Sequence, residues 1–339
     1  MIPCWHAGEA CIPSQHQPAL VLDYARRREL PARTVFPDTG LDSWDMPDPA
    51  HAISPQQYLK LLANVAAALD SADTSFQLGQ HMLPGHFGAL SHALTQAASL
   101  RAAIGLMTRF PLTLSPLLTP RLAEEGELAI IYLTDAMGAG RQRGFLVEMH
   151  MTAFSAMCRW LFGERLPWRF CFNRTQPRYV EQHEVHLGQR LRFGCHLDAL
   201  VIDAHWLDQP WPRANGTAAA VLVRQADLLG ERRAFLDAVY DYLYENVRSG
   251  PSLEQTAAAF AVSPATLKRH LARHGSHFQA ELDQVRAHVS LRLLHRGCDN
   301  EALARHLGFH DANNFRRSFK RWTGMTPMLL RQGLGSALA

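Results

Sequence analysis

The sequence has few cysteines, and their spacing fits neither a metal site nor a set of disulfide bonds. Of its 339 residues six are cysteine, and no two of them form a CxxC pair. Structural zinc sites and disulfide frameworks depend on such regular spacing. The six are Cys4, Cys11, Cys158, Cys171, Cys195 and Cys298. We therefore expect a reduced protein that needs no metal and no cofactor.

Long apolar runs and an export signal are also missing. No apolar run approaches the ~18 residues of a membrane span. The first residues, MIPCWHAGEACIPS, have neither the basic region nor the apolar region of a secretory signal. The sequence therefore predicts a cytoplasmic protein with no membrane partner.

Little in the sequence points to catalysis. No Ser/His/Asp arrangement, glycine-rich phosphate loop or carboxylate pair in helical register stands out. The 18 histidines are spread over the whole chain. His81, His86 and His92 do lie close together, but their spacing does not repeat. We expect no enzymatic activity, and a metal-sensing role remains an alternative because imidazole and thiolate bind transition metals.

Basic charge is concentrated at the C-terminal end. The chain has 34 Lys and Arg against 31 Asp and Glu, a formal net charge of +3. Residues 251–339 carry 12 basic and 6 acidic side chains, whereas residues 1–250 carry 22 basic and 25 acidic ones. Such an asymmetry is expected when one end of a protein meets a polyanion and the other does not.

The length and the 47% of hydrophobic residues fit a globular protein of two domains, at ~100–200 residues each. Residues 1–50 show no sustained period and are expected to form an irregular leader. Ser54 with Pro55, and later Ser99, predict helix starts. Two β-prone runs, 117–122 and 128–133, flank a turn at 124–127 and predict a hairpin.

A long helix is expected over residues 143–162, followed by strands near 168–172, 191–193 and 200–203. Residues 1–210 are therefore predicted to form an α+β domain. A segment rich in Pro and Gly, residues 209–216, ends that domain and begins a linker over 211–232. Residues 233–333 then read as an all-α domain.

Two helix-turn-helix units are predicted in the all-α domain. In the first, Ser252 begins a short helix with a capping box to Gln255. Ser263 caps a second helix with Pro264 at its first position, where a missing N–H costs nothing. Leu267 and Leu271 point inward on that helix. The side chains turned outward are Ala265, Lys268 and Arg269.

The second unit repeats this order about 48 residues later. Asp299 caps a helix that Gly308 ends, and Asp311 caps the next one. In that last helix, Phe315, Phe319 and Trp322 form an apolar stripe of core residues. The opposite face carries Asn313, Asn314, Arg316, Arg317, Lys320 and Arg321. A basic helix after a tight turn is typical of a recognition helix that enters the major groove of DNA.

A helix that starts at Ser276 and runs to Gly297 is predicted to join the two units. Its ~21 residues would span roughly 31 Å at ~1.5 Å per residue. This length is close to the ~34 Å repeat of B-DNA, so one molecule could place two recognition helices in successive major grooves.

Residues 233–333 resemble the DNA-binding domain of the AraC/XylS family of bacterial regulators. The most specific stretches are ARHLGF at 304–309 and NFRRSFKRWTGMTP at 314–327. Residues 1–210 resemble the arabinose-binding-type N-terminal domain of one branch of that family. This likeness rests on Leu78-Gly79 and on PGHFGAL at 84–90, FNRTQP at 172–177 and LRFG at 191–194.

The resemblance implies a regulator that binds double-stranded promoter DNA, responds to a small-molecule effector and works with RNA polymerase, most often as an activator. A homodimer is a further expectation. It also implies which outward side chains contact bases: Ala265, Lys268, Arg269, Asn313, Asn314 and Arg317. Asn suits adenine, Arg suits guanine, and Ala265 can meet only a thymine methyl group.

The remaining polar side chains of the two recognition helices are expected at phosphates: Ser263, Thr266, Arg316, Lys320 and Arg321. Trp160, Trp168, Phe170 and Phe172 are more typical of a core than of a pocket. The candidate lining of an effector pocket is Phe87, Met107, Trp160 and Phe170. The alternatives are a regulator that senses metal or thiol oxidation, and an enzyme domain tethered to DNA.

Overall fold

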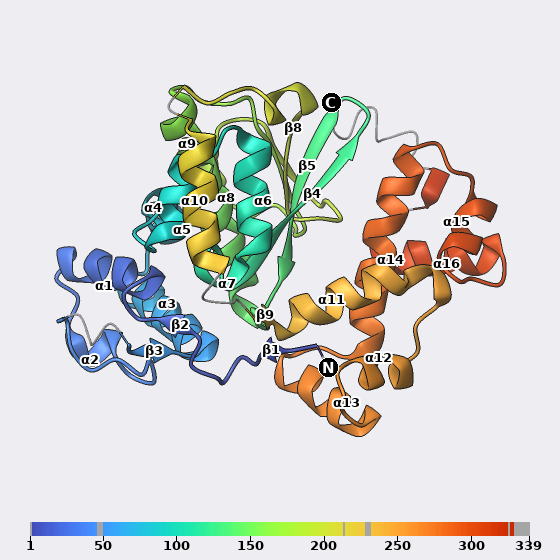
Figure 1. The fold of residues 1–339 in the computed structure, drawn as a ribbon, viewed down its shortest axis with the longest axis horizontal. Coiled ribbons are helices and arrows are strands. Elements are labelled where there is room, and N and C mark those ends of the chain that lie inside the picture. Colours follow the sequence, from blue (N-terminus) through green and yellow to red (C-terminus); the bar gives the residue numbers. More distant parts are fainter. Residues whose placement is uncertain (1, 46–49, 213, 228–231, 325, 329–339) are drawn as a thin grey trace.

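The computed structural model describes residues 2–45, 50–212, 214–227, 232–324 and 326–328. An α+β part and an all-helical part lie side by side, and a five-stranded sheet runs between the helices of the first part and those of the second (Figure 1). This division agrees with the predicted fold class. The predicted linker residues 228–231 and the predicted domain end at residue 333 lie outside the described residues.

The sheet has the strand order β4-β5-β8-β6-β7 and is antiparallel except between β6 and β7. The predicted hairpin is confirmed, but its turn is shorter than expected because Glu125 still pairs with Leu128. Gly126, with φ of 58°, makes the left-handed turn. The strands are β4 (Leu118–Glu125), β5 (Leu128–Asp135), β6 (Arg169–Phe172), β7 (Leu191–Phe193) and β8 (Ala199–Asp203).

Alternating side chains of the sheet enter two different cores. Ile131 and Leu200 belong to the core of the α+β part, whereas Tyr132 and Val201 belong to a core shared with the helical part. Since successive side chains of a strand point to opposite faces, each face of the sheet has its own partner layer. The helical part is therefore docked on the second face.

Helices cover the first face of the sheet, and α8 is the longest of them. Gly79 allows α4 to lie directly on α8, because a Cβ atom there would be 2.4 Å from the carbonyl oxygen of Met149. The predicted helix starts at Ser54 and Ser99 are confirmed as capped. The helices are α3 (Pro55–Leu69), α4 (Thr74–Met82), α5 (Ala89–Thr95), α6 (Leu100–Arg109), α7 (Pro111–Leu114), α8 (Arg143–Phe162) and α9 (Glu181–Leu187), with short 3-10 turns at Gly140–Gln142 and Ala204–Leu207.

The prediction of an irregular leader over residues 1–50 is wrong. Helix α1 (Gln17–Arg27) buries Val21, Leu22 and Ala25 in the first core, and Pro18 stands in its first turn, where proline favours a helix start. The helix was missed because its apolar residues at helical spacing form a short pattern, which stands among prolines and histidines. The other elements there are β2 (Ile12–Pro13), which pairs with β3 (Ala52–Ile53), and α2 (Ala32–Val35).

The first residues of the chain lie on the helical part (Figure 1). Strand β1 (Cys4–Trp5) pairs in parallel with β9 (Arg233–Ala234). The N–H of Ala7 donates to Nε2 of His274 over 3.1 Å, while Nδ1 of that ring lies 2.8 Å from the carbonyl oxygen of His270. His274 is therefore a neutral imidazole protonated at Nδ1, in agreement with a pKa that burial lowers.

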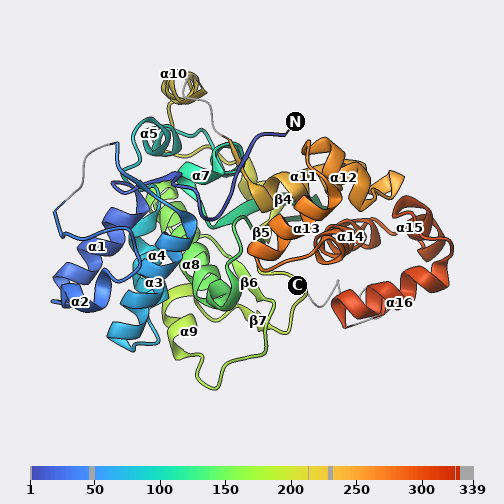
Figure 2. The ribbon, with the colours of Figure 1, turned by 90° about the horizontal axis from the view of Figure 1, so that it is seen from below.

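The segment predicted as a linker contains helix α10 (Gly216–Asp227), which packs against α5. The helical part follows, and α15 and α16 lie at its outer end (Figure 2). Its helices are α11 (Phe235–Asn246), α12 (Leu253–Ala259), α13 (Pro264–Arg273), α14 (Phe278–His295), α15 (Asn300–His306) and α16 (Ala312–Thr323), with a 3-10 turn at Val247–Ser249.

The joining helix is shorter than predicted. Helix α14 has 18 residues and begins after His277, whose side chain accepts the N–H of Ala280. Its length is therefore about 27 Å. The predicted start at Ser276 is wrong because the Ser276 hydroxyl is engaged with the carboxylate of Glu281.

Candidate nucleic-acid interface

Side-chain caps fix where the four helices of the two predicted units begin. Ser252 and Gln255 form the predicted capping box, and Ser263 accepts the N–H of Thr266 over 3.1 Å. Asp299 and Asp311 each accept the N–H three residues on, at 2.7 Å. Backbone donation to Asp311 lowers the pKa of its carboxyl group. All four caps agree with the sequence.

In the first unit, α12 and α13 meet at a tight turn. Ala261 has φ of 55°, and the N–H of Val262 donates to the carbonyl oxygen of Ala257 over 3.0 Å. Leu267 and Leu271 are fully buried. The predicted reading residues of this unit are exposed on the other side of α13: Ala265, Lys268 and Arg269.

In the second unit, Gly308 has φ of 71° and turns the chain between α15 and α16. Phe315 and Phe319 are fully buried, as expected of the apolar stripe. Trp322 is only partly buried, and its ring lies 5.7 Å from that of Phe309. The predicted polar face is exposed along its whole length: Asn313, Asn314, Arg316, Arg317, Lys320 and Arg321.

The side chains of this face differ in how they are engaged. Nδ2 of Asn314 donates to the cap residue Asp311 over 3.1 Å, and Arg316 donates to the side chain of Asn313. Among the described residues, the side chains of Arg317 and Lys320 have no hydrogen bond or ion pair. These two cations are therefore the ones on α16 that are free to meet an external partner.

Arg321, which was expected at a phosphate, has a partner inside the protein. Its Nη2 lies 3.1 Å from Oδ2 of Asp283 on α14. This pair links α16 to the joining helix. Ser263 and Thr266 are likewise engaged with each other, since their hydroxyl oxygens lie 2.9 Å apart at the start of α13. Arg321 and the two hydroxyl groups therefore stabilise the helix-turn-helix units, and this role is separate from any contact with DNA.

Three of the four residues predicted to line an effector pocket, Phe87, Met107 and Phe170, are buried in the first core, and Phe87 fills the space beside Gly85. The fourth, Trp160, does not belong to this core and is 57% exposed on α8. None of the four lines the cavity that lies between the two parts of the molecule.

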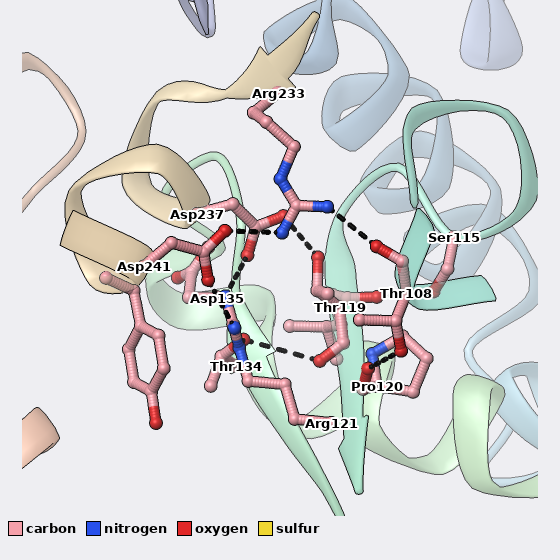
Figure 3. Close-up of polar contacts among 12 residues, drawn as sticks. Thr108, Ser115, Thr119, Pro120, Arg121, Thr134, Asp135, Arg233, Asp237 and Asp241 are labelled. Carbon is pink, nitrogen blue, oxygen red and sulfur yellow. Dashed lines mark hydrogen bonds and ion pairs between the residues drawn. The ribbon is translucent and has the colours of Figure 1, made fainter. Parts of the chain in front are cut away.

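Sequence reasoning missed the ion-pair network that joins the two parts (Figure 3). Arg121 on β4 donates to Asp237 over 3.1 Å and to Asp241 over 2.5 Å, both on α11. Arg233 also donates to Asp241, over 2.6 Å. The missed signal was the i, i+4 pair of aspartates among the apolar residues in the first half of α11.

A second chain of polar contacts crosses the same interface. The hydroxyl oxygens of Tyr132 on β5 and Tyr240 on α11 lie 3.3 Å apart, and Nδ1 of His288 on α14 lies 2.8 Å from the latter. Burial lowers the pKa of His288 to about 3, so its imidazole is neutral at physiological pH. These contacts fix α11 and α14 against the sheet.

Three further observations concern metal ligands, membrane-spanning helices and thiol groups. Within the described ranges, no three His, Cys, Asp or Glu side chains gather where they could hold one metal ion. No helix in the described part of the chain is both long and apolar enough to cross a membrane. The thiol groups of Cys171 and Cys195 are hydrogen-bonded, which lowers the pKa of Cys195.

Family models match both parts of the chain. Residues 30–211 match the model described as the arabinose-binding domain of the AraC transcription regulator, and residues 256–333 match that of a helix-turn-helix domain. The crystal structure of the transcriptional regulator CdpR from Pseudomonas aeruginosa aligns over 92% of this chain and 96% of its own, with a TM-score of 0.42 and 19% identity.

Relatives of known sequence cover most of the chain. The ornithine utilization regulator of Pseudomonas aeruginosa is 27% identical over 261 residues, 75% of this chain and 77% of that protein. The HTH-type transcriptional regulator Rv1395 of Mycobacterium tuberculosis is 23% identical over 325 residues, 91% of this chain and 93% of its own. Since the match to the N-terminal model alone spans more than half of the residues, the chain belongs to the AraC family of DNA-binding transcription regulators.

Proposed function

We propose that this regulator reads a promoter with α13 and α16, and that α16 supplies the main sequence-specific contact. The single observation that carries this proposal is the pair Arg317 and Lys320, exposed on α16 without partners among the described residues. Arg can bind guanine through two hydrogen bonds, whereas Lys offers a point charge to a phosphate. We also assign base contacts to Ala265, Lys268, Arg269, Asn313 and Asn314, and phosphate contacts to Ser263, Thr266 and Arg316.

The affinity of the full-length protein for its operator is expected to fall steeply with salt. Each neutralised phosphate contributes a slope of about −0.9 to log K against log salt. Arg316→Ala should therefore make the slope less negative by about 0.9. Fluorescence anisotropy between 50 and 200 mM salt, roughly the range over which such slopes are resolved, measures it.

The control for this measurement is Arg33→Ala, which removes an exposed cation from α2 in the other domain. Its slope should equal that of the unaltered protein. An unchanged slope for Arg316→Ala would remove Arg316 from the phosphate contacts.

We further propose that the N-terminal domain makes DNA binding respond to a small molecule, and that the protein acts in the cytoplasm as an activator, with RNA polymerase and a second copy of itself as partners and without enzymatic activity. What supports this is the match of residues 30–211 to an arabinose-binding domain. One relative is named for ornithine utilization, so L-ornithine is the first compound to test. Mass spectrometry of small molecules that stay bound through purification gives an independent identification.

A second candidate function is thiol sensing, and the hydrogen-bonded thiols of Cys171 and Cys195 favour it. Hydrogen peroxide could oxidise the two thiols to one disulfide, with release of two protons and reduction of the peroxide to water. Both residues border the core shared by the two domains. A disulfide there would act on the same interface as an effector.

Replacing Cys158, Cys171 and Cys195 together by Ser is expected to leave the effector response intact, because an effector-driven regulator needs no thiol. The measurement is operator binding with and without effector, and with and without hydrogen peroxide. Cys298→Ser in the DNA-binding domain is the matched control. A folded triple variant that no longer responds, beside a control that does, would establish thiol sensing in place of effector sensing.

A further inference from the structure

A cavity of about 240 Å³ lies between the two domains. On one side it is lined by Arg143 at the start of α8 and by His196 in the segment before β8. On the other side it is lined by Gln284 and Ala287 of α14 and by Trp322 near the end of α16. Any molecule that occupies this cavity therefore touches the N-terminal domain and the recognition helix at the same time.

Two nitrogen atoms of the lining residues are buried without a hydrogen-bond partner among the described residues: Nε1 of Trp322 and Nε2 of His196. A buried polar group left unpaired destabilises a folded protein, and most such groups are paired. Trp322 can only donate. Burial lowers the pKa of His196, so its ring is neutral and can either accept or donate. Both residues line the cavity, but neighbouring atoms cover these two nitrogens, so a bound molecule contacts the rings through their other atoms.

The charged groups of the cavity leave donors over rather than acceptors. Asp198 accepts from Nε and Nη2 of Arg143, at 3.1 and 2.8 Å, and from the N–H of Asn173 at 2.8 Å. Nη2 of Arg143 also donates to the carbonyl oxygen of Leu133. Nη1 of Arg143 has no partner among the described residues. The second carboxylate of the cavity, Asp283, is paired with Arg321 and accepts from Gln279.

We propose that this cavity binds a small organic carboxylate, whose oxygens accept hydrogen bonds from Nη1 of Arg143, and that this molecule is the effector. Nη1 is a donor without a partner among the described residues, and a carboxylate forms the stronger, charge-assisted bond with a guanidinium. The volume is below the ~300–1,000 Å³ of sites for drug-sized ligands, which suits a small metabolite. This inference rests on the proposed function.

Such a site couples the effector to DNA binding. A ligand shifts a conformational equilibrium only by its difference in affinity for the two states. A molecule that is bound by Arg143 and also contacts Trp322 keeps all of its contacts only while α16 is docked against the N-terminal domain. Occupation of the cavity therefore stabilises one position of the recognition helix.

The test is isothermal titration of the full-length protein with three carboxylates: L-ornithine, succinate and benzoate. Putrescine, succinamide and benzamide are the matched compounds without a carboxylate. At least one acid should bind, and at least tenfold more tightly than its counterpart, because a hydrogen bond to a charged group is worth about 1.5–3 kcal/mol and 1.4 kcal/mol is tenfold. Arg143→Gln should weaken the binding of that acid by a similar factor.

Arg159→Gln is the matched control, since Arg159 is exposed on the same helix α8 and should leave binding of the acid unchanged. Ala287→Met fills the cavity from α14 and should abolish binding, so it decides the outcome if Arg143→Gln unfolds. Binding of none of the three acids, equal binding of an acid and its counterpart, or equal binding to Ala287→Met would overturn the proposal.

Operator binding by the unaltered protein is measured with and without each acid in the same samples. If the protein binds its operator but no carboxylate, only the cavity proposal falls. If it binds no operator either with or without the acids, the proposed function falls as well, whatever the calorimetry shows.

Discussion

Arg121→Met is expected to lower the free energy of unfolding by about 3–5 kcal/mol, the range for removing one partner of a buried ion pair. The Arg121 side chain is 11% exposed and that of Asp237 is not exposed at all. Methionine keeps much of the apolar stem, so the loss comes mainly from the carboxylate left unpaired in the interface (Figure 3). Urea unfolding followed by circular dichroism at neutral pH measures it.

The pH dependence of this variant separates charge from packing. Burial raises the pKa of Asp237, and Arg121 opposes the rise. Without Arg121 the folded-state pKa rises further above the unfolded value, so folding takes up a proton. The loss in the free energy of unfolding should be fully present above the folded-state pKa of Asp237 and should shrink as the pH falls through that pKa. A deficit that does not change with pH would mean that lost packing, not the unpaired charge, causes it.

Two further variants complete the comparison. Arg121→Met combined with Asp237→Asn should recover much of the loss, because an amide is far cheaper to bury than a charge. Arg101→Met is the matched control, since Arg101 pairs with Glu124 and Asp208 at the surface. Ion pairs in water contribute little, so this control should change stability far less. A control that costs as much as Arg121→Met would contradict the role given to burial.

Arg317→Ala is expected to weaken binding to the operator by about 5- to 150-fold while changing non-specific binding only by one lost charge. A bidentate Arg–guanine contact is worth about 1–3 kcal/mol of discrimination, and 1.4 kcal/mol is a factor of ten. Lys320 lies about one helical turn further along α16, and Lys320→Ala should lower the affinity for operator and for scrambled DNA by the same factor. The two variants together separate reading of the sequence from binding to the backbone.

Titrations of both variants on operator and scrambled DNA at one salt concentration measure this difference. Neither side chain has a partner among the described residues, so each substitution should leave the fold intact. If Arg317→Ala lowers the affinity for operator and for scrambled DNA by the same factor, Arg317 does not contact a base in a sequence-specific way. The proposed position of α16 in the groove would then be wrong.

Local signals were enough to predict most secondary structure that bears on DNA binding. The caps Ser263 and Asp311 and the turn at Gly308 act over three or four residues, so they can be identified without tertiary contacts. The buried positions Phe315 and Phe319 follow from helical spacing alone. The start of α14 was predicted at Ser276 instead of after His277. A serine hydroxyl can cap a helix or bind a side chain, and only the position of Glu281 decides between the two.

The cavity that we propose as the effector site could not be predicted in this way. Aromatic residues such as Phe170 and Trp160 look alike in the sequence, yet one is sealed inside the core and the other is exposed to solvent. The cavity between the domains is formed by Arg143, His196 and Trp322. No short-range pattern joins residues so far apart, and their role depends on which hydrogen bonds the fold leaves unmade.

The sequence by itself determined the two helix-turn-helix units, the hairpin and the basic face of α16, since each depends on the preferences of neighbouring residues. Only the tertiary structure decided how the domains meet. Arg121 and Asp237 are 116 positions apart in the sequence. The paired strands β1 and β9 are separated in the sequence by almost the whole N-terminal domain. Charge pairs and cavities of this kind form when the surfaces of two domains come into contact. Burial then changes the free energy of polar groups that water would otherwise solvate.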